Sequence, residues 1–162
     1  MSDFVAFDVQ DKFDKAFATV GGIVEAFPED NWLVPHGDDF YIASRIAYHM
    51  AVFIDGTIAG NSSNPDFAAN LPFGSWAEGT AETLPDKAAF IAYFDKAVAS
   101  AKEALAKLTD EDLITPLPEE NARFGKTRVG VYLHFIRELA AHSGELNKML
   151  NELGLYDVWI SR

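Results

Sequence analysis

The stretch that most constrains the fold is IASRIAYHMAVFI, residues 42–54, which carries apolar side chains on almost every side of a helix. A helix that is hydrophobic all round is stable only when other elements surround it. Gly56, Gly60 and the polar run at 61–65 end this pattern. The sequence therefore predicts a buried helix over about residues 41–59, at the centre of a helical bundle.

An amphipathic helix is predicted before it, ending at Pro28. Gly21 and Gly22 lie inside this helix, where they either weaken it or allow a neighbouring segment to come close. Its apolar side chains recur at alternating spacings of four and three residues, as one face of a helix requires; they are Phe13, Phe17, Val20, Val24 and Phe27.

Two more amphipathic helices follow, over about residues 86–108 and 127–153. Thr83 or Asp86 is the candidate N-cap of the earlier one, and Gly154 is the expected C-cap of the later one. No segment shows the sustained alternation of apolar and polar residues that marks a strand. Four helices joined mostly by short links predict an all-α protein with the architecture of a four-helix bundle.

The link at residues 61–84 is long for a compact domain, and links of such length are often functional. Three aromatic side chains stand in it among Gly, Pro and Asn residues: Phe67, Phe73 and Trp76. They could roof a pocket, or they could pin the link to the bundle, and the sequence leaves both interpretations open.

Length and charge restrict the function. The chain has 162 residues, which suits a single domain spanning 1–162. Its net charge of −12 argues against nucleic acid or anionic membranes as partners. It has no cysteine, so thiol chemistry would need a small-molecule thiol. No apolar stretch reaches the roughly 20 residues of a membrane span, and the first residues lack a signal-peptide pattern, so we expect a soluble cytoplasmic protein.

Side chains able to bind metal recur every fourth residue in the last predicted helix, at His134, Glu138 and His142. Side chains four apart on a helix are neighbours. His134 and His142 would lie about 12 Å apart along the axis, so they cannot share one ion. On a helical wheel His142 falls in the middle of the apolar arc, Glu138 within it and His134 at its edge. Glu138 and His142 are therefore the favoured pair of ligands.

The central helix adds two polar side chains one turn apart on its inward face, Arg45 and His49. His49 is the candidate third ligand. Two histidines and one carboxylate leave positions open for water or substrate, as in catalytic zinc sites. Arg45 should meet an anion, either Glu138 or a carboxylate of a bound small molecule.

Other chemistries find less support in the sequence. A di-iron bundle needs Glu-x-x-His motifs on two helices, whereas this chain has a single Glu-x-x-x-His at 138–142. It has neither a GxSxG elbow nor a phosphate-binding glycine loop. The alternative to a metal site is a buried polar network of His49, Glu138 and Arg45 that holds no ion.

These motifs, in their order and spacing, resemble the DinB-like superfamily, which includes bacillithiol- and mycothiol-dependent transferases and mycothiol-dependent maleylpyruvate isomerase. The likeness covers nearly the whole chain, through RIAYHMAVF around His49, LTDEDLITPLP after the third helix and HFIRELAAHSGELNKMLNELGL in the last. His142-Ser-Gly144-Glu145 is similar to the closing His-x-Gly-Gln of the family. Glu138 stands at the first ligand position of that helix. The isomerase branch of the family is similar, because it also has glutamate at this position.

The resemblance implies an up-down-down-up bundle, often a homodimer, in which His49, Glu138 and His142 hold a divalent ion such as zinc, nickel or iron. It implies a metal-dependent transferase, isomerase or hydrolase that acts on a small-molecule substrate with a low-molecular-weight thiol. In such an enzyme Arg45 would orient a substrate carboxylate. His134 would support a ligand or shuttle a proton, and the alternative for it is a solvated histidine at the edge of the helix. The rival interpretation is a non-catalytic bundle that binds a small apolar ligand or a protein partner.

Overall fold

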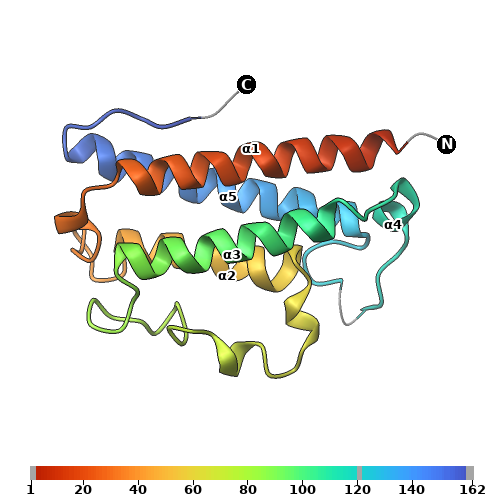
Figure 1. Cartoon of the computed structure of the whole chain (residues 1–162), viewed down its shortest axis with the longest axis horizontal. Helices are drawn as coiled ribbons and strands as arrows, with labels where there is room; N and C mark the ends of the chain where they lie inside the picture. Colours follow the sequence, from red (N-terminus) through yellow and green to blue (C-terminus); the bar gives the residue numbers. More distant parts are fainter. Residues whose placement is uncertain (1–2, 120–121, 160–162) are drawn as a thin grey trace.

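Four long helices make up most of the computed structural model, which describes residues 3–119 and 122–159 (Figure 1). α1 packs against α3 and α5, and α2 packs against the same two helices. In Figure 1, α1 and α5 run in one direction and α2 and α3 in the other. The described residues contain isolated β-bridges but no strand, so the all-α prediction is confirmed. The bounds of the four helices are α1 Phe4–Ala26, α2 Ala43–Phe53, α3 Lys87–Leu105 and α5 Arg128–Glu152.

Short helical elements connect the long ones. After α1 comes η1 (Glu29–Asn31), and η3 (Asn61–Ser63) and η4 (Ala68–Asn70) lie in the long link before α3. After α3 comes α4 (Asp110–Ile114), where the sequence indicates only a link. Its single turn is too short to show an apolar period, and it is held instead by a capping box between residues 109 and 112.

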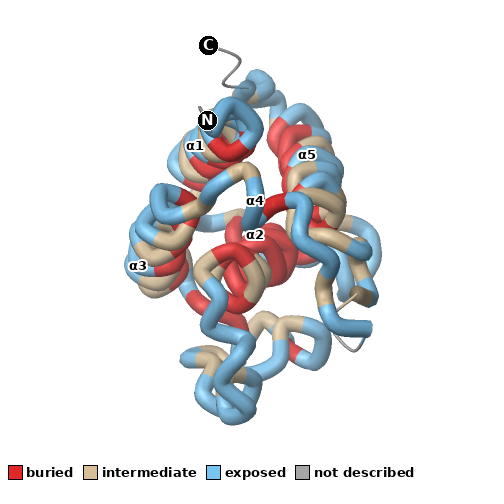
Figure 2. The backbone as a smooth tube through the Cα atoms, turned by 90° about the vertical axis from the view of Figure 1, so that its right-hand side faces the viewer, coloured by how far each residue is buried: buried red, intermediate tan, exposed pale blue. Residues whose placement is uncertain are grey.

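α2 forms the buried centre of the fold, as predicted. Every residue from 43 to 52 is buried, and Figure 2 shows the helix in red among the others. It continues into a wider π-helical turn, η2 (Ile54–Ile58), rather than staying α-helical to residue 59. A Cβ atom on Gly56 would stand 2.9 Å from Cε1 of Phe67, so this turn lets the long link pack directly on the helix backbone. No described helix is both long and apolar enough to cross a membrane.

Local sequence signals set the helix ends. Asp86, and not Thr83, caps α3, because its Oδ1 accepts a hydrogen bond from the backbone N–H of Ala89 at 2.8 Å. Gly154 follows α5 with a φ of +77°, a left-handed conformation that favours glycine. Both ends agree with the capping residues expected from the sequence.

The glycine pair in α1 allows another segment of the chain to pack closely against the helix. A Cβ on Gly22 would stand only 2.9 Å from Cγ1 of Val158, in the segment after α5. Asn147 of α5 holds that segment by accepting from the Val158 N–H at 2.9 Å and donating to its carbonyl at 3.1 Å. The absence of a side chain at this point of α1 therefore lets the C-terminal segment lie across the helix.

Phe13 provides a test of how the core is packed. It is 0% exposed, and its ring centroid lies 5.7 Å from that of Phe17 and 5.4 Å from that of Tyr132. Replacing it with Ala should lower the free energy of unfolding by about 3–5 kcal/mol, since truncation leaves a cavity. The control is Phe7→Ala on the same helix, where the side chain is 69% exposed and the change should stay within about 0.5 kcal/mol. Urea unfolding measures both, and similar losses would contradict this packing.

Candidate metal centre

Three titratable side chains of α5 lie in sequence along one side of the helix, with Glu138 in the middle. Its Oε1 lies 4.0 Å from Nε2 of His134, and its Oε2 lies 3.9 Å from Nε2 of His142. The two histidines thus flank the carboxylate from opposite turns, as the helical rise requires. Glu138 can share an ion with either histidine, but not with both.

His49 approaches the same place from α2. Its ring centroid lies 4.8 Å from that of His142, and the rings are nearly perpendicular. The side chain is 8% exposed, and its Nδ1 is buried without a hydrogen-bond partner among the described residues. Burial, assisted by repulsion from His142 and opposed by Glu138, lowers the pKa of His49 to about 4. His49 is therefore neutral near pH 7, the state in which an imidazole can bind a metal ion.

His142 is oriented by a carboxylate that the sequence analysis did not identify as its partner. Its Nδ1 lies 2.7 Å from Oε2 of Glu145, one turn further along α5. A neutral histidine that donates its Nδ1–H to this carboxylate carries its lone pair on Nε2, on the side of Glu138. Histidine ligands of metal ions are commonly held in this way by a carboxylate. The i, i+3 spacing of the two residues was the available signal.

Glu138 already has a cationic neighbour. Its Oε1 accepts a hydrogen bond from the guanidinium of Arg137 at 2.8 Å, and this bond is the main reason why the pKa of Glu138 is lowered. The side chains of Glu138 and His142 are 30% and 22% exposed. The helical wheel indicated deeper burial, but both lie at a partly open rim, because the face of α5 beside them is not fully covered. The carboxylate is therefore ionised and reachable from solvent.

The donor atoms are of types that bind metal ions, but they stand too far apart to bind one in this arrangement. Ligand atoms around a tetrahedral ion with bonds of about 2.0–2.1 Å lie roughly 3.3 Å from each other. The distance from His142 Nε2 to Glu138 Oε2 is 3.9 Å, and no three His, Asp or Glu side chains within residues 3–119 and 122–159 stand close enough to hold an ion. The chemistry of the residues fits, including the unpaired nitrogen of His49, but the side chains would have to move closer together to hold an ion.

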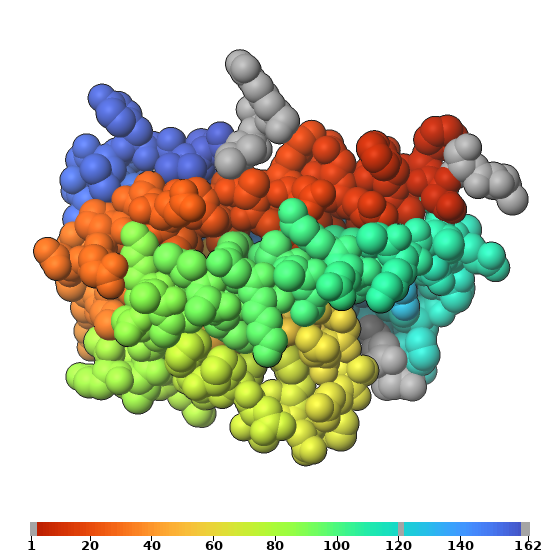
Figure 3. Space-filling view, viewed as in Figure 1, coloured from red at the N-terminus to blue at the C-terminus, as the bar shows by residue number. Residues whose placement is uncertain are grey.

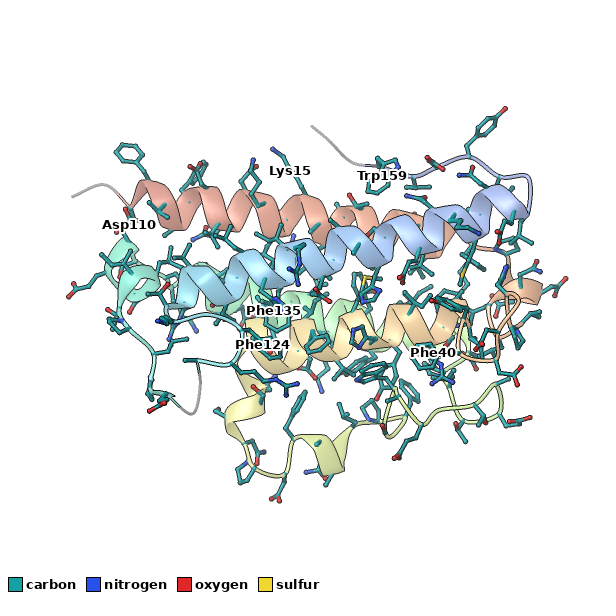
Figure 4. The ribbon with its side chains drawn as sticks, turned by 180° about the vertical axis from the view of Figure 1, so that it is seen from behind. Lys15, Phe40, Asp110, Phe124, Phe135 and Trp159 are labelled. Atoms are coloured by element: carbon teal, nitrogen blue, oxygen red, sulfur yellow. The ribbon has the colours of Figure 1, made fainter. Side chains whose placement is uncertain are left out.

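The long link covers His49. The ring centroid of Trp76 lies 3.9 Å from that of His49, and Phe53 packs on the imidazole from α2 with centroids 4.5 Å apart. Figure 4 shows Phe135 and Phe124 in the space between α5 and α2, further along the contact between these two helices. Of the two interpretations of the aromatic side chains in the link, Trp76 supports the anchoring one, because its ring packs directly on the imidazole of His49.

Arg45 holds this cover in place and does not contact Glu138. Its Nη1 donates to the carbonyls of Trp76 and Ala77, at 2.9 Å each, and its Nη2 donates to the carbonyl of Gly79. The guanidinium also lies over the ring of Phe40, 4.7 Å from its centroid. Glu138, one of the two anions expected for Arg45, is therefore not its partner, because most of the hydrogen-bond donors of Arg45 bond to backbone carbonyls.

His134 stands beside the proposed ligands, at one end of the site. Its ring stacks on Phe124 with centroids 4.8 Å apart, and its Nδ1 lies 3.2 Å from Nη2 of Arg137. Since its Nε2 is within 4.0 Å of Glu138, the structure brings it to the carboxylate but not to His49 or His142. This position would allow it to exchange a proton with Glu138 or with a molecule bound there.

Comparison with known protein families gives a match. Residues 10–146 match the DinB superfamily, a range that includes both long-helix segments that carry the candidate ligands. No curated protein matches the chain.

The lowered pKa of His49 predicts a pH dependence of stability in the metal-free protein. The ordinary pKa of histidine is about 6.5, so between pH 6.5 and 4 the unfolded chain binds a proton here that the folded chain does not. The free energy of unfolding should therefore fall as the pH drops through this range. Urea unfolding at several pH values measures it, and His49→Gln should flatten the fall. An identical fall in the variant would contradict a neutral buried imidazole.

The bonds of Arg45 predict that it fixes the link. Arg45→Lys leaves one ammonium in place of a fork that reaches three carbonyls, and each hydrogen bond to a charged group contributes about 1.5–3 kcal/mol. Protease cleavage within residues 70–80 should become roughly tenfold faster or more. Arg137→Lys, on the exposed side of α5, is the matched control and should leave the rate unchanged. Equal rates in all three proteins would show that Arg45 does not hold the link.

Proposed function

The chain belongs to the DinB superfamily, and on that premise we propose that it binds one divalent metal ion through His49, Glu138 and His142 and acts as a thiol-dependent transferase or isomerase. Zinc, nickel and iron all suit a site of two imidazoles and one carboxylate. A low-molecular-weight thiol would supply the sulfur, since the chain has no cysteine. The substrate would be a small molecule that reaches the partly exposed rim of the site.

The observation that carries the proposal is the orientation of His142. Its Nδ1 is engaged by Glu145 at 2.7 Å, and its Nε2 lies on the side of Glu138, 3.9 Å from the carboxylate. A histidine with one nitrogen held by a carboxylate and the other free is prepared for a ligand. The buried Nδ1 of His49, which has no partner among the described residues, adds a second nitrogen in need of one.

A bound divalent ion would lower the pKa of a thiol or water molecule and so provide a nucleophile near neutral pH. The residues of the chain would do the rest. Trp76 and Phe53 would keep water away from His49, and His134 would accept or return a proton beside Glu138. Arg45 retains a buried Nε without a partner among the described residues, and this is one of the donors left for a substrate carboxylate.

A non-catalytic bundle is the second candidate, and one observation favours it. Glu138 is bonded to Arg137 and His142 to Glu145, so these polar groups have partners without an ion. In that case the site would be a polar network between α2 and α5 that serves to bind a small apolar ligand or a protein partner.

The proposal includes the wider arrangement implied by the family. The pairing of the long helices and their directions support an up-down-down-up four-helix bundle. A cytoplasmic location and a homodimer remain predictions from the sequence. Both would be consistent with a metal-dependent enzyme that acts on small molecules.

Metal analysis of protein purified without an affinity tag tests the proposal. We expect one ion per chain, and at a free metal concentration of about 100 times Kd the ion should stabilise the fold by about 2.7 kcal/mol. For a chain of this length that raises Tm by roughly 5–10 °C. A chelator should remove both the ion and the shift.

The controls are two histidine variants. His49→Ala should lose the ion and the shift, whereas His36→Ala should keep both, because His36 lies beside Glu152 and away from the proposed ligands. If neither the natural chain nor the variants bind an ion, and a chelator leaves the melting temperature unchanged, the non-catalytic bundle is the better account.

A further inference from the structure

A hollow lies at the end of the molecule where η2, the C-terminal part of α3 and the start of α5 meet. Its volume is about 630 Å³, within the range of small-molecule sites. In Figure 3 the segment that follows α2, in yellow, lies directly beneath α3, in green. Its polar lining includes Thr57, Ser62, Arg123, Arg128 and Tyr132.

The two arginines of this hollow lack the partners that Arg45 and Arg137 have. Arg45 is bonded to backbone carbonyls and Arg137 to Glu138. Arg123 and Arg128 make no hydrogen bond or ion pair to the described residues, and Arg123 lies 5.0 Å from the ring centroid of Phe124. In a chain of net charge −12, two cations left unpaired in one hollow form a local site for an anion.

A tyrosine lines the same space. Tyr132 is 5% exposed, lines the hollow and has no hydrogen-bond partner for its hydroxyl among the described residues. Burial raises its pKa, so the phenol stays protonated and able to donate. The hydroxyl is therefore available to donate a hydrogen bond to an anion in the hollow.

The carboxylate of Asp112 lies close enough to Arg128 and Tyr132 to interact electrostatically with both. Its Oδ2 is already bonded to the backbone N–H and the hydroxyl of Thr109, at 3.0 and 2.7 Å. The carboxylate is therefore engaged in the capping box of α4, and it makes no hydrogen bond to the guanidinium of Arg128.

We propose that this hollow binds the carboxylate or phosphate group of a small organic anion, through the guanidinium groups of Arg123 and Arg128 and the hydroxyl of Tyr132. Guanidinium forks match the planar oxygens of either group. The size of the hollow suits a metabolite-sized ligand, and the acidic remainder of the chain opposes a polyanion such as nucleic acid.

The site is separate from the proposed metal ligands, although it adjoins them. Phe124 lines the hollow and stacks on His134, which is 4.0 Å from Glu138. Anion binding requires no ion at His49, so the proposal holds whether or not the chain is a metal enzyme.

The test is titration of the metal-free protein with succinate and, separately, with inorganic phosphate, followed by NMR. Backbone amide signals of residues 60–63 and 128–132 should shift and saturate. Arg123→Gln and Arg128→Gln should each weaken binding about tenfold or more, since each removes a charged hydrogen bond. Tyr132→Phe, which keeps the ring and its packing, should weaken it by a smaller factor.

The matched control is Lys126→Gln, which removes one positive charge from an exposed side chain between the two arginines. It should change the affinity less than twofold. Stronger binding of succinate would identify a carboxylate ligand, and stronger binding of phosphate a phosphate ligand. Shifts that do not saturate, or an equal effect of Lys126→Gln and Arg128→Gln, would overturn the proposal. Repeating the titration on His49→Ala separates this result from any failure of the metal site.

Discussion

The structure depends on how α2 accommodates two polar side chains in a helix that is buried on all sides. A buried cation or imidazole is costly unless it is paired or neutral. Arg45 is paired, through the carbonyls of residues 76, 77 and 79, and His49 is neutral, between the rings of Trp76 and Phe53. The same contacts keep the long link folded over α2. The interactions that stabilise the buried Arg45 and His49 therefore also fix the position of the link.

The candidate metal centre follows from the contact between α2 and α5. α2 supplies a rigid, neutral imidazole from inside, and α5 supplies Glu138 and His142 at a rim that solvent can reach. Glu145 orients His142, and Arg137 holds Oε1 of Glu138. The other carboxylate oxygen, Oε2, lies on the side of His142 at 3.9 Å, so the chemistry of these donors suits an ion although the two atoms stand too far apart. An ion bound through Oε2 could leave the bond between Arg137 and Oε1 in place.

The sequence was most informative where the signal was periodic or local. The buried α2, the stripe of α1 and the caps at Asp86 and Gly154 all follow from side-chain spacing or single-residue conformation. Contacts between distant segments were not predictable. Nothing in the spacing indicates that Arg45 would meet the carbonyls around Trp76 or that η2 would open into a π turn. Such contacts arise only when the link and the helices pack together.

The most direct test of the central claim is anomalous diffraction at the absorption edge of the metal, from crystals of the untagged protein. The account predicts one strong peak between α2 and α5, about 2.0–2.2 Å from a ring nitrogen of His49, from Nε2 of His142 and from a carboxylate oxygen of Glu138. It predicts that Glu145 keeps its bond to Nδ1 of His142. A peak elsewhere, or none after soaking with metal, would contradict it.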